Sequence, residues 1–475
     1  MPLIKQTEPV TTPLEKKKIL FLSDHPLAPS GVGVQARMLI EGLIATGKFK
    51  FLCLGGAIKH PDYSTVQVNS DFIIKPVDGF GTRDQVRNIL MTERPDAIII
   101  FTDPRQFVWL WEVEDEIHQL CPIAYWHVWD NDPYPMFNRV WYESTELINC
   151  LSHKTYEMVK PHFPEKTNYI PHSFPKQMYF AGPENEIAQL RKANFGPRAD
   201  WFMALWVNRN ATRKLPSDVM EAWKLFLDKL EKEEGHRKAC LVMHTDPGDP
   251  EGPNLLMVQE LLGLQNNVLF SVQKLDFGHM NVLHNVTDCC INVAKNEGFG
   301  LSTLISLQCG KPVVALKTGG LTRQVVDYRD GTELGVAIEP VTRKLVGSQM
   351  VPYIYEDFAS QEDVANGLMK IYKMTAEEKA AMKAKTTEYV AHEFSFEKMI
   401  EDWSRTLSET IQKWEAEKAT RKRWSITPLN VQVQPQRMAA QVEKSKPSIN
   451  LPADHPFKKI HPTILAKLGV KGKGK

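Results

Sequence analysis

Short apolar runs alternate with longer amphipathic runs along most of the chain, and this feature constrains its fold more than any other. The apolar runs from Ile19–Ser23 to Leu147–Leu151 have the length of buried strands, and the runs between them have helical spacing. A second set begins at Phe202–Val207 and ends at Gly335–Ile338. Such alternation is typical of parallel sheets covered by helices. The sequence therefore predicts an α/β protein with two Rossmann-like domains.

Proline and glycine mark the boundary between the two predicted domains, in the stretch from Pro171 to Pro197. The last predicted helix, from Ser395 to about Glu415, carries an apolar stripe that must pack against another part of the protein. We expect five segments, which are an N-terminal extension (1–17), a first domain (18–180), a second domain (198–392), a closing helix (393–415) and a C-terminal tail (416–475).

The predicted tail concentrates positive charge, although Lys+Arg 58 nearly equals Asp+Glu 57 over the whole chain. Residues 416–475 contain thirteen Lys or Arg, three Asp or Glu and six Pro, which gives a net charge of +10. This composition cannot supply a packed core, so we expect a basic, mostly disordered tail. Two interpretations stay open: a solubilising extension, or an electrostatic tether to nucleic acid or an anionic surface.

Membrane-spanning and secreted proteins are not expected from this sequence. Apolar runs such as Ala97–Phe101 are far shorter than the roughly 18 residues that a membrane-spanning helix needs. The polar segment Met1–Lys18 lacks the apolar core of a secretory signal. The seven cysteines form no C-x-x-C pair, so reduced thiols in a cytoplasmic protein are the expectation.

A glycine-rich segment follows the predicted strand that ends at Val293 and opens a helix that runs through Cys309. Glycines let the backbone approach a ligand, and free amides at a helix N-terminus can hold a diphosphate without a metal ion. Glu297 stands at the carboxyl edge of the strand, where it could accept hydrogen bonds from sugar hydroxyls. The candidate donor-binding residues here are Gly298, Phe299, Gly300, Leu301, Ser302 and Thr303.

The run EGFGLSTLISLQCGKPVVALKTGGL, residues 297–321, resembles the donor-site signature of the retaining glycosyltransferases of family four. The resemblance extends over about residues 18–415 and implies the GT-B fold, in which a donor cleft lies between two Rossmann-like domains. It also implies that Glu297 faces the donor sugar. The position of the family's second glutamate, which grips the ribose, falls on Ile305 in this chain. Ser306 or Gln308 could substitute for it, the donor could be unusual, or Ile305 only packs in the helix and the nucleoside is held elsewhere.

Two further segments match the family's cleft. In the run VNRNATRK, Arg209 and Lys214 resemble the pair that clamps the donor pyrophosphate, where cations stabilise the departing nucleoside diphosphate. In the first domain, Gly31 and Gly33 resemble the glycines that line the cleft before the first helix. The alternative for Arg209 and Lys214 is a solvated cationic loop, and the alternative for Gly31 and Gly33 is a tight strand-to-helix turn.

His127 ends a predicted strand at the position where the family places a cleft histidine near the donor sugar. The alternative is a core histidine. Asp130 and Asp132 follow in an Asp-x-Asp pattern, which would suit a divalent metal in the other major glycosyltransferase fold. We expect no metal, because helix amides and cations are available for the diphosphate. Asp130 could instead orient His127 or contact the acceptor.

The resemblance implies a metal-independent glycosyltransferase that needs no cofactor beyond a nucleotide-sugar co-substrate and retains the anomeric configuration. Catalysis would rest on His127, Glu297, Arg209 and Lys214. Two alternatives stay open. The basic tail would suit an enzyme that glycosylates hydroxylated bases in DNA. The change at Ile305 would suit an inactive nucleotide-sugar-binding or scaffolding protein.

Overall fold

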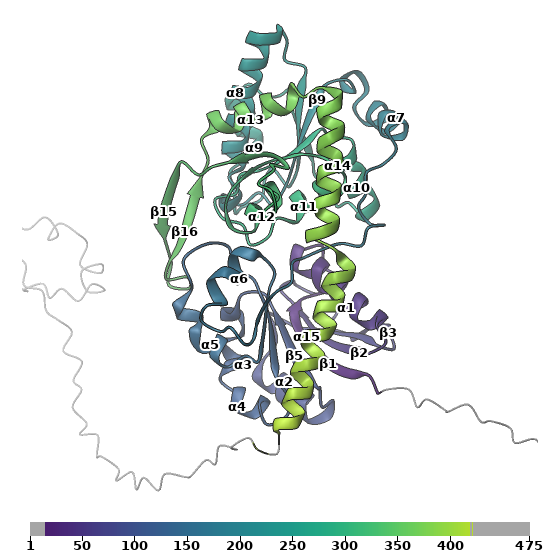
Figure 1. The fold of residues 1–475 in the computed structure, drawn as a ribbon, viewed down its shortest axis with the longest axis vertical. Coiled ribbons are helices and arrows are strands. Elements are labelled where there is room, and N and C mark those ends of the chain that lie inside the picture. The colour runs from purple at the N-terminus through teal and green to yellow at the C-terminus, as the bar shows by residue number, and fades with distance from the viewer. Residues whose placement is uncertain (1–14, 419, 421–475) are drawn as a thin grey trace, which may run out of the picture. The chain divides into compact units, whose positions relative to one another are not determined.

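The computed structural model describes residues 15–418 and residue 420 (Figure 1). The described residues all belong to one compact unit. Residues 1–14 of the predicted N-terminal extension and residues 419 and 421–475 of the predicted tail lie outside the described part.

The first sheet has eight strands, formed by residues from the first half of the chain. They are β1 (Lys17–Asp24), β2 (Phe49–Gly56), β3 (Val66–Asn69), β4 (Phe72–Pro76), β5 (Ala97–Phe101), β6 (Ile123–His127), β7 (Leu147–Cys150) and β8 (Thr167–Tyr169). Their spatial order is β3-β4-β2-β1-β5-β6-β7-β8, and all neighbours are parallel except β3 and β4. The helices of this domain are α1 (Gly31–Ala45), α2 (Arg83–Thr92), α3 (Val108–Trp111), α4 (Glu114–Ile117), α5 (Arg139–Glu143) and α6 (His153–Val159).

The second sheet has six parallel strands in the order β11-β10-β9-β12-β13-β14. They are β9 (Phe202–Val207), β10 (Ala239–His244), β11 (Val268–Ser271), β12 (Cys289–Asn292), β13 (Val313–Leu316) and β14 (Gly335–Ile338). The helices are α7 (Glu184–Phe195), α8 (Pro216–Glu234), α9 (Leu255–Leu261), α10 (Phe277–Asn285), α11 (Leu301–Gln308), α12 (Thr322–Val325), α13 (Gln361–Tyr372) and α14 (Ala376–Glu393). The prediction of two Rossmann-like α/β domains is confirmed.

Helices α10 and α12 of this half were not predicted, and neither were a hairpin and α7. An antiparallel hairpin, β15 (Thr342–Val346) and β16 (Ile354–Phe358), follows the last strand of the second sheet. Helix α7 occupies much of the stretch expected to be an irregular boundary. None of its residues is buried, so it lacks the apolar face that would have identified it. Helix α1 also begins at Gly31, three residues before the predicted start at Val34, because Ser30 caps it.

The inner strands of the first sheet are buried on both faces, and their residues alternate between two cores. Phe21, Ile99 and Trp126 contribute to the core that also contains residues of α1. Their neighbours Leu22 and Tyr125 contribute to the core on the other face. This alternation fixes the side of the sheet on which each functional residue of the domain lies.

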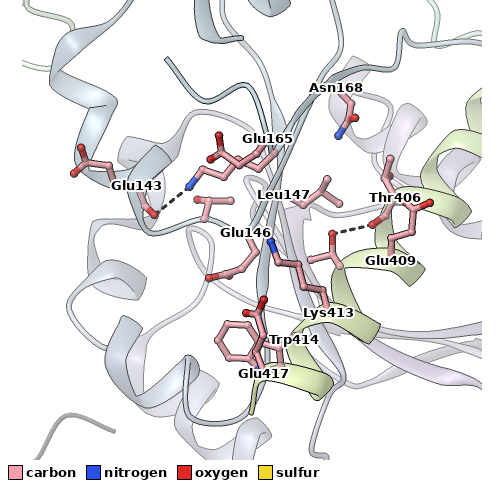
Figure 2. A pocket seen from close by; sticks show the side chains of 13 residues that line it. Glu143, Glu146, Leu147, Glu165, Asn168, Thr406, Glu409, Lys413, Trp414 and Glu417 are labelled. Carbon is pink, nitrogen blue, oxygen red and sulfur yellow. Dashed lines mark hydrogen bonds between the residues drawn. The ribbon is translucent and has the colours of Figure 1, made fainter. Parts of the chain in front are cut away.

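Helix α15 (Phe396–Glu417) follows α14 and packs on the first domain (Figure 1). The ring of Trp403 lies 5.3 Å from that of Trp126, and Thr406 accepts a hydrogen bond from Asn149 Nδ2 at 3.2 Å. Gly42 of α1 leaves room for Ile400. The stripe predicted for the closing helix is therefore buried against the first domain. Figure 2 shows a polar pocket beside this helix, lined in part by Glu146, Asn168, Thr406 and Lys413.

None of the helices in the described residues is both long enough and apolar enough to cross a membrane. All seven cysteines are buried, and none forms a disulfide.

Candidate functional site

The glycine-rich segment joins β12 to the N-terminus of α11. Gly300 caps the helix with φ of 94°, a left-handed conformation that glycine adopts without strain. A Cβ at this position would collide with Leu321, at 2.5 Å from its Cδ2. The sequence therefore needs glycine here to start the helix directly after the loop.

The predicted donor-binding side chains of this loop differ in their surroundings. The hydroxyl of Thr303 is fully buried, donates to the carbonyl of Gly300 at 2.6 Å and contacts Gln324. Phe299 packs between His172 and Phe394, with ring centroids 5.0 and 5.8 Å away. These two side chains therefore hold the loop in place. Their engagement leaves the loop backbone, the partly exposed Leu301 and Ser302, which is 8% exposed, as the groups that can meet a ligand.

Glu297 and Lys214 form a buried ion pair between the loops that follow β12 and β9. The two residues are 8% and 9% exposed. Burial acts to raise the pKa of the Glu297 carboxyl, but Lys214 and Arg213 outweigh it and the pKa is lowered. Glu297 is therefore an anion held by two cations at the carboxyl edge of the second sheet.

Arg213 connects this pair to the first domain. Its Nη1 donates to the carbonyl of Asn296 at 2.9 Å and lies 3.9 Å from Glu297 Oε1. The same nitrogen lies 3.7 Å from Oδ2 of Asp130, which follows β6 in the first domain. We call Asp130, Arg213, Lys214 and Glu297 the charged cluster. It contains residues from both domains.

Three glycines allow the two domains to meet at the charged cluster. A Cβ on Gly298 would lie 2.8 Å from Asp130 Oδ1. A Cβ on Gly319 would collide with the carbonyl oxygens of Glu297 and Asp130, and its φ of 47° also favours glycine. Gly320 donates its amide to the carbonyl of Glu297 at 2.8 Å. Glycine backbone of the second domain therefore packs directly on Asp130 of the first domain.

The N-terminus of α1 approaches that of α11. Ser30 caps α1 by accepting from the amide of Gly33 at 3.0 Å and donates to Asp24 at 2.7 Å. A Cβ on Gly31 would lie 3.1 Å from Leu301 Cδ1, and one on Gly33 would lie 2.7 Å from the carbonyl oxygen of His25. The predicted glycines of the first domain thus stand beside the donor loop, where two helix N-termini favour an anion.

The structure does not bring His127 to the cleft. Its side chain is fully buried, its Nε2 lies 2.7 Å from Tyr142 Oη in a hydrogen bond, and its ring stacks on Tyr125 at 4.6 Å. Strand alternation explains this position, because residues 125 and 127 share the face opposite Trp126. Burial lowers the pKa of His127 to about 3. It is a neutral core histidine.

Arg209 also lies apart from the charged cluster. Its side chain is 57% exposed and forms ion pairs with Asp249 at 2.7 Å and Glu251 at 2.9 Å. Arg213, four residues further along, occupies the position beside Lys214 and Glu297 that was expected for Arg209. The signal for Arg213 was its place directly before Lys214, within the short turn Thr212–Lys214 that ends at Leu215 (φ 49°).

Ile305 packs in the core, with 7% of its surface exposed. The two proposed substitutes for the family's second glutamate already have partners. Ser306 bonds His284 Nδ1 at 2.7 Å, and Gln308 Nε2 donates to the carbonyl of Phe174 at 3.2 Å. The other polar atom of Gln308, Oε1, is a buried acceptor without a hydrogen-bond partner among the described residues, so a ribose contact by Gln308 stays a prediction.

Among residues 15–418, no three His, Cys, Asp or Glu side chains gather in an arrangement that could hold a metal ion. Asp132 is paired with Lys154 at 2.7 Å and with Arg343 at 3.5 Å. The two carboxylates of the Asp-x-Asp pattern therefore have separate cationic partners.

Comparison with solved structures defines the class of fold. Sucrose-phosphate synthase from Thermosynechococcus elongatus superposes with a TM-score of 0.64 at 15% identity, covering 84% of this chain and 100% of that one. Anabaena HepE, solved with UDP and glucose, has a TM-score of 0.60 at 16% identity and covers 82% and 99%. The chain is a two-domain protein with the GT-B fold.

The second domain also matches a family in sequence. Residues 190–341 match the model of the family described as Glycosyl transferases group 1. N-acetyl-alpha-D-glucosaminyl L-malate synthase of Bacillus anthracis is 24% identical over 242 residues, which cover 47% of this chain and 58% of that protein. The match thus spans less than two thirds of that relative. The chain resembles the GT-B glycosyltransferases of family four, as residues 297–321 predicted.

Proposed function

We propose that the protein is a glycosyltransferase that moves a sugar from a nucleoside-diphosphate donor to an acceptor hydroxyl. The observation that carries this proposal is the charged cluster, in which Glu297, Lys214 and Arg213 of the second domain meet Asp130 of the first. The match of residues 190–341 to a glycosyltransferase family supports the same activity.

The cluster can perform two parts of such a transfer. Negative charge grows on the departing diphosphate, so Lys214 and Arg213, with the N-terminus of α11, would stabilise the transition state more than the ground state. Glu297 holds both cations in place and presents carboxylate oxygen to sugar hydroxyls. We propose that Asp130, the cluster's residue from the first domain, faces the acceptor.

The proposed reaction retains the anomeric configuration and needs neither a metal ion nor a cofactor other than the nucleotide sugar. Retention follows if the acceptor attacks from the face that the diphosphate leaves, with the acceptor proton passing to the diphosphate. The cations beside Glu297 support a metal-independent site, since they supply the positive charge that a metal would otherwise provide.

A donor panel tests the proposal. UDP-, GDP-, ADP- and dTDP-sugars are added to the full chain with EDTA, and thermal stability and donor hydrolysis are measured. UDP-glucose is a sensible first donor, because the Anabaena neighbour has also been solved with it. We expect one nucleotide class to raise Tm and to be hydrolysed slowly. Stabilisation without turnover would leave a binding protein or an enzyme that turns over only with its acceptor, and no response to any donor would overturn the proposal.

Glu297→Gln links the result to the site. The amide keeps the size of the side chain but removes the anion that holds Lys214 and Arg213, so we expect turnover to fall by at least about 100-fold. Glutamine is preferred to alanine at this position because it limits the cost of leaving Lys214 buried without a partner. Full turnover in this variant would remove Glu297 from the site.

A further inference from the structure

The hairpin β15–β16 lies outside the residues that match the family, because the match ends at residue 341 and the hairpin begins at Thr342. It belongs in sequence to the second domain, yet it contacts the first. The amide of Tyr355 donates to the carbonyl of Asp132 at 2.8 Å, and the amide of Met136 donates to Tyr353 Oη at 3.0 Å. The hairpin therefore joins the two domains beside the charged cluster.

Asp357 is the buried centre of this junction. The residue is fully buried. Its carboxylate accepts hydrogen bonds from Asn131 Nδ2 at 2.7 Å, Thr318 Oγ1 at 2.8 Å and Arg343 Nε at 2.7 Å. Burial acts to raise the pKa of Asp357, but these three donors outweigh it and the pKa is lowered. The carboxylate is therefore an anion with its donors already arranged around it, one of them from the first domain.

Asn131 connects this anion to the site. It is 1% exposed, and besides Asp357 its Nδ2 contacts Thr318 Oγ1 at 3.1 Å and the carbonyl of Tyr355 at 3.2 Å. It directly follows Asp130. A residue held by three contacts to the second domain restricts where the preceding carboxylate can lie.

We propose that the hairpin is a brace between the domains and that Asp357 is a positioning residue, which fixes Asp130 against Arg213 and Glu297 by holding Asn131. This inference rests on the proposed glycosyl transfer. Transfer between groups carried on two domains depends on their relative placement, and a small displacement of one group is enough to cost a large factor in rate. The brace supplies that placement through contacts that touch neither donor nor acceptor.

The first experiment needs no substrate. Hydrogen exchange is measured on the full chain and on its Asp357→Asn variant. The substitution keeps the size of the side chain but replaces one carboxylate oxygen with an NH₂ group, which cannot accept the hydrogen bonds that the neighbouring groups donate. We expect faster exchange in residues 128–138 and in the hairpin, with the rest of the described chain unchanged. Unchanged exchange in residues 128–138 would overturn the brace, whether or not the protein is a glycosyltransferase.

Kinetics then test the positioning role. The donor-binding groups of the cluster are all in the second domain, so Asp357→Asn should lower kcat between about 10-fold and 100-fold and change the donor Kd less than about threefold. Asp130→Ala should also lower kcat, and adding it to Asp357→Asn should cause little further loss, because both changes remove the same placement. Additive losses would contradict action through Asp130.

Two variants guard against a purely structural explanation. Glu356→Gln, on the same strand, breaks the 2.9 Å ion pair with Lys295 inside the second domain and should leave kcat within about threefold of wild type. An equal loss in this control would mean that any weakening of the hairpin matters. Asn131→Ala approaches the junction from the first domain and should reproduce the kinetics of Asp357→Asn; normal kinetics would overturn the proposal.

Discussion

Arg213 and Arg209 differ in what their guanidinium groups touch, and the difference predicts opposite results on substitution. Arg213 lies 3.9 Å from Glu297 and 3.7 Å from Asp130, whereas Arg209 pairs with Asp249 and Glu251 on an exposed loop. Arg213→Gln should lower donor turnover by about 10-fold to 100-fold, because a cation at the diphosphate is lost. Arg209→Gln should change it less than about threefold. Steady-state donor hydrolysis measures both, and the reverse order would restore Arg209 to the site.

His127 should matter for stability and not for turnover. Its imidazole is buried and hydrogen-bonded to Tyr142, so His127→Ala leaves a cavity and leaves the buried Tyr142 hydroxyl with only the long 3.5 Å hydrogen bond from Asn138 Nδ2. We expect a loss of about 2–4 kcal/mol in the free energy of unfolding, measured by urea denaturation. The kcat of the folded variant should stay within about threefold of wild type. A selective loss of kcat with normal stability would return His127 to a catalytic role.

Four predicted site residues show how far sequence reasoning reaches at the scale of single residues. Glu297 and Lys214 were predicted, and the structure pairs them, because each follows a strand of one parallel sheet and those strand ends meet at one edge. His127 and Arg209 were predicted by their place in a motif. The direction of the His127 side chain depends on its hydrogen bond to Tyr142. The position of the Arg209 side chain depends on its ion pair with Asp249, forty residues further along the chain.

At the scale of elements, α15 should contribute strongly to the stability of the first domain. Trp403 is fully buried against Trp126, so Trp403→Ala should reduce the free energy of unfolding by about 3–5 kcal/mol. Glu401→Ala on an exposed turn of the same helix is the matched control and should change it by less than about 0.5 kcal/mol. Urea denaturation measures both, and equal effects would mean that α15 packs only loosely.

Several strands with strong apolar patterns were predicted well, and two elements without such a pattern were missed. Strands β10 and β14 have the predicted bounds, because their apolar residues are buried in a parallel sheet. The strand β15 has four exposed residues among its five, and α7 buries none, so neither carries a period that identifies it. The hairpin is formed by cross-domain contacts such as that of Asp357 with Asn131, which no local pattern records.

At the scale of the whole molecule, stability should fall in mild acid. Burial lowers the pKa of His127, His172 and His284 to about 3 in the folded protein, against about 6.5 in the unfolded chain. Below pH 6.5 the unfolded chain therefore binds protons that the folded protein does not, and together the three groups lower the free energy of unfolding by about 4 kcal/mol between pH 7.5 and 5.5.

Urea denaturation at the two pH values measures this effect. In His284→Gln the difference between the two pH values should shrink by about a third, whatever the variant's own stability, because one titrating group has been removed. An undiminished difference would mean that other groups cause the acid sensitivity.

The position of α15 also governs the order in which the molecule can be completed during synthesis. The last strand of the first sheet ends at Tyr169, but the core of that domain includes Trp403 and Ile411 from the far end of the described chain. Domains generally fold as they emerge, the N-terminal one first. Here the first domain would leave the ribosome with Trp126 uncovered, and the second domain would be made in full before the helix that covers it. The domain that begins the chain is therefore the last to be finished.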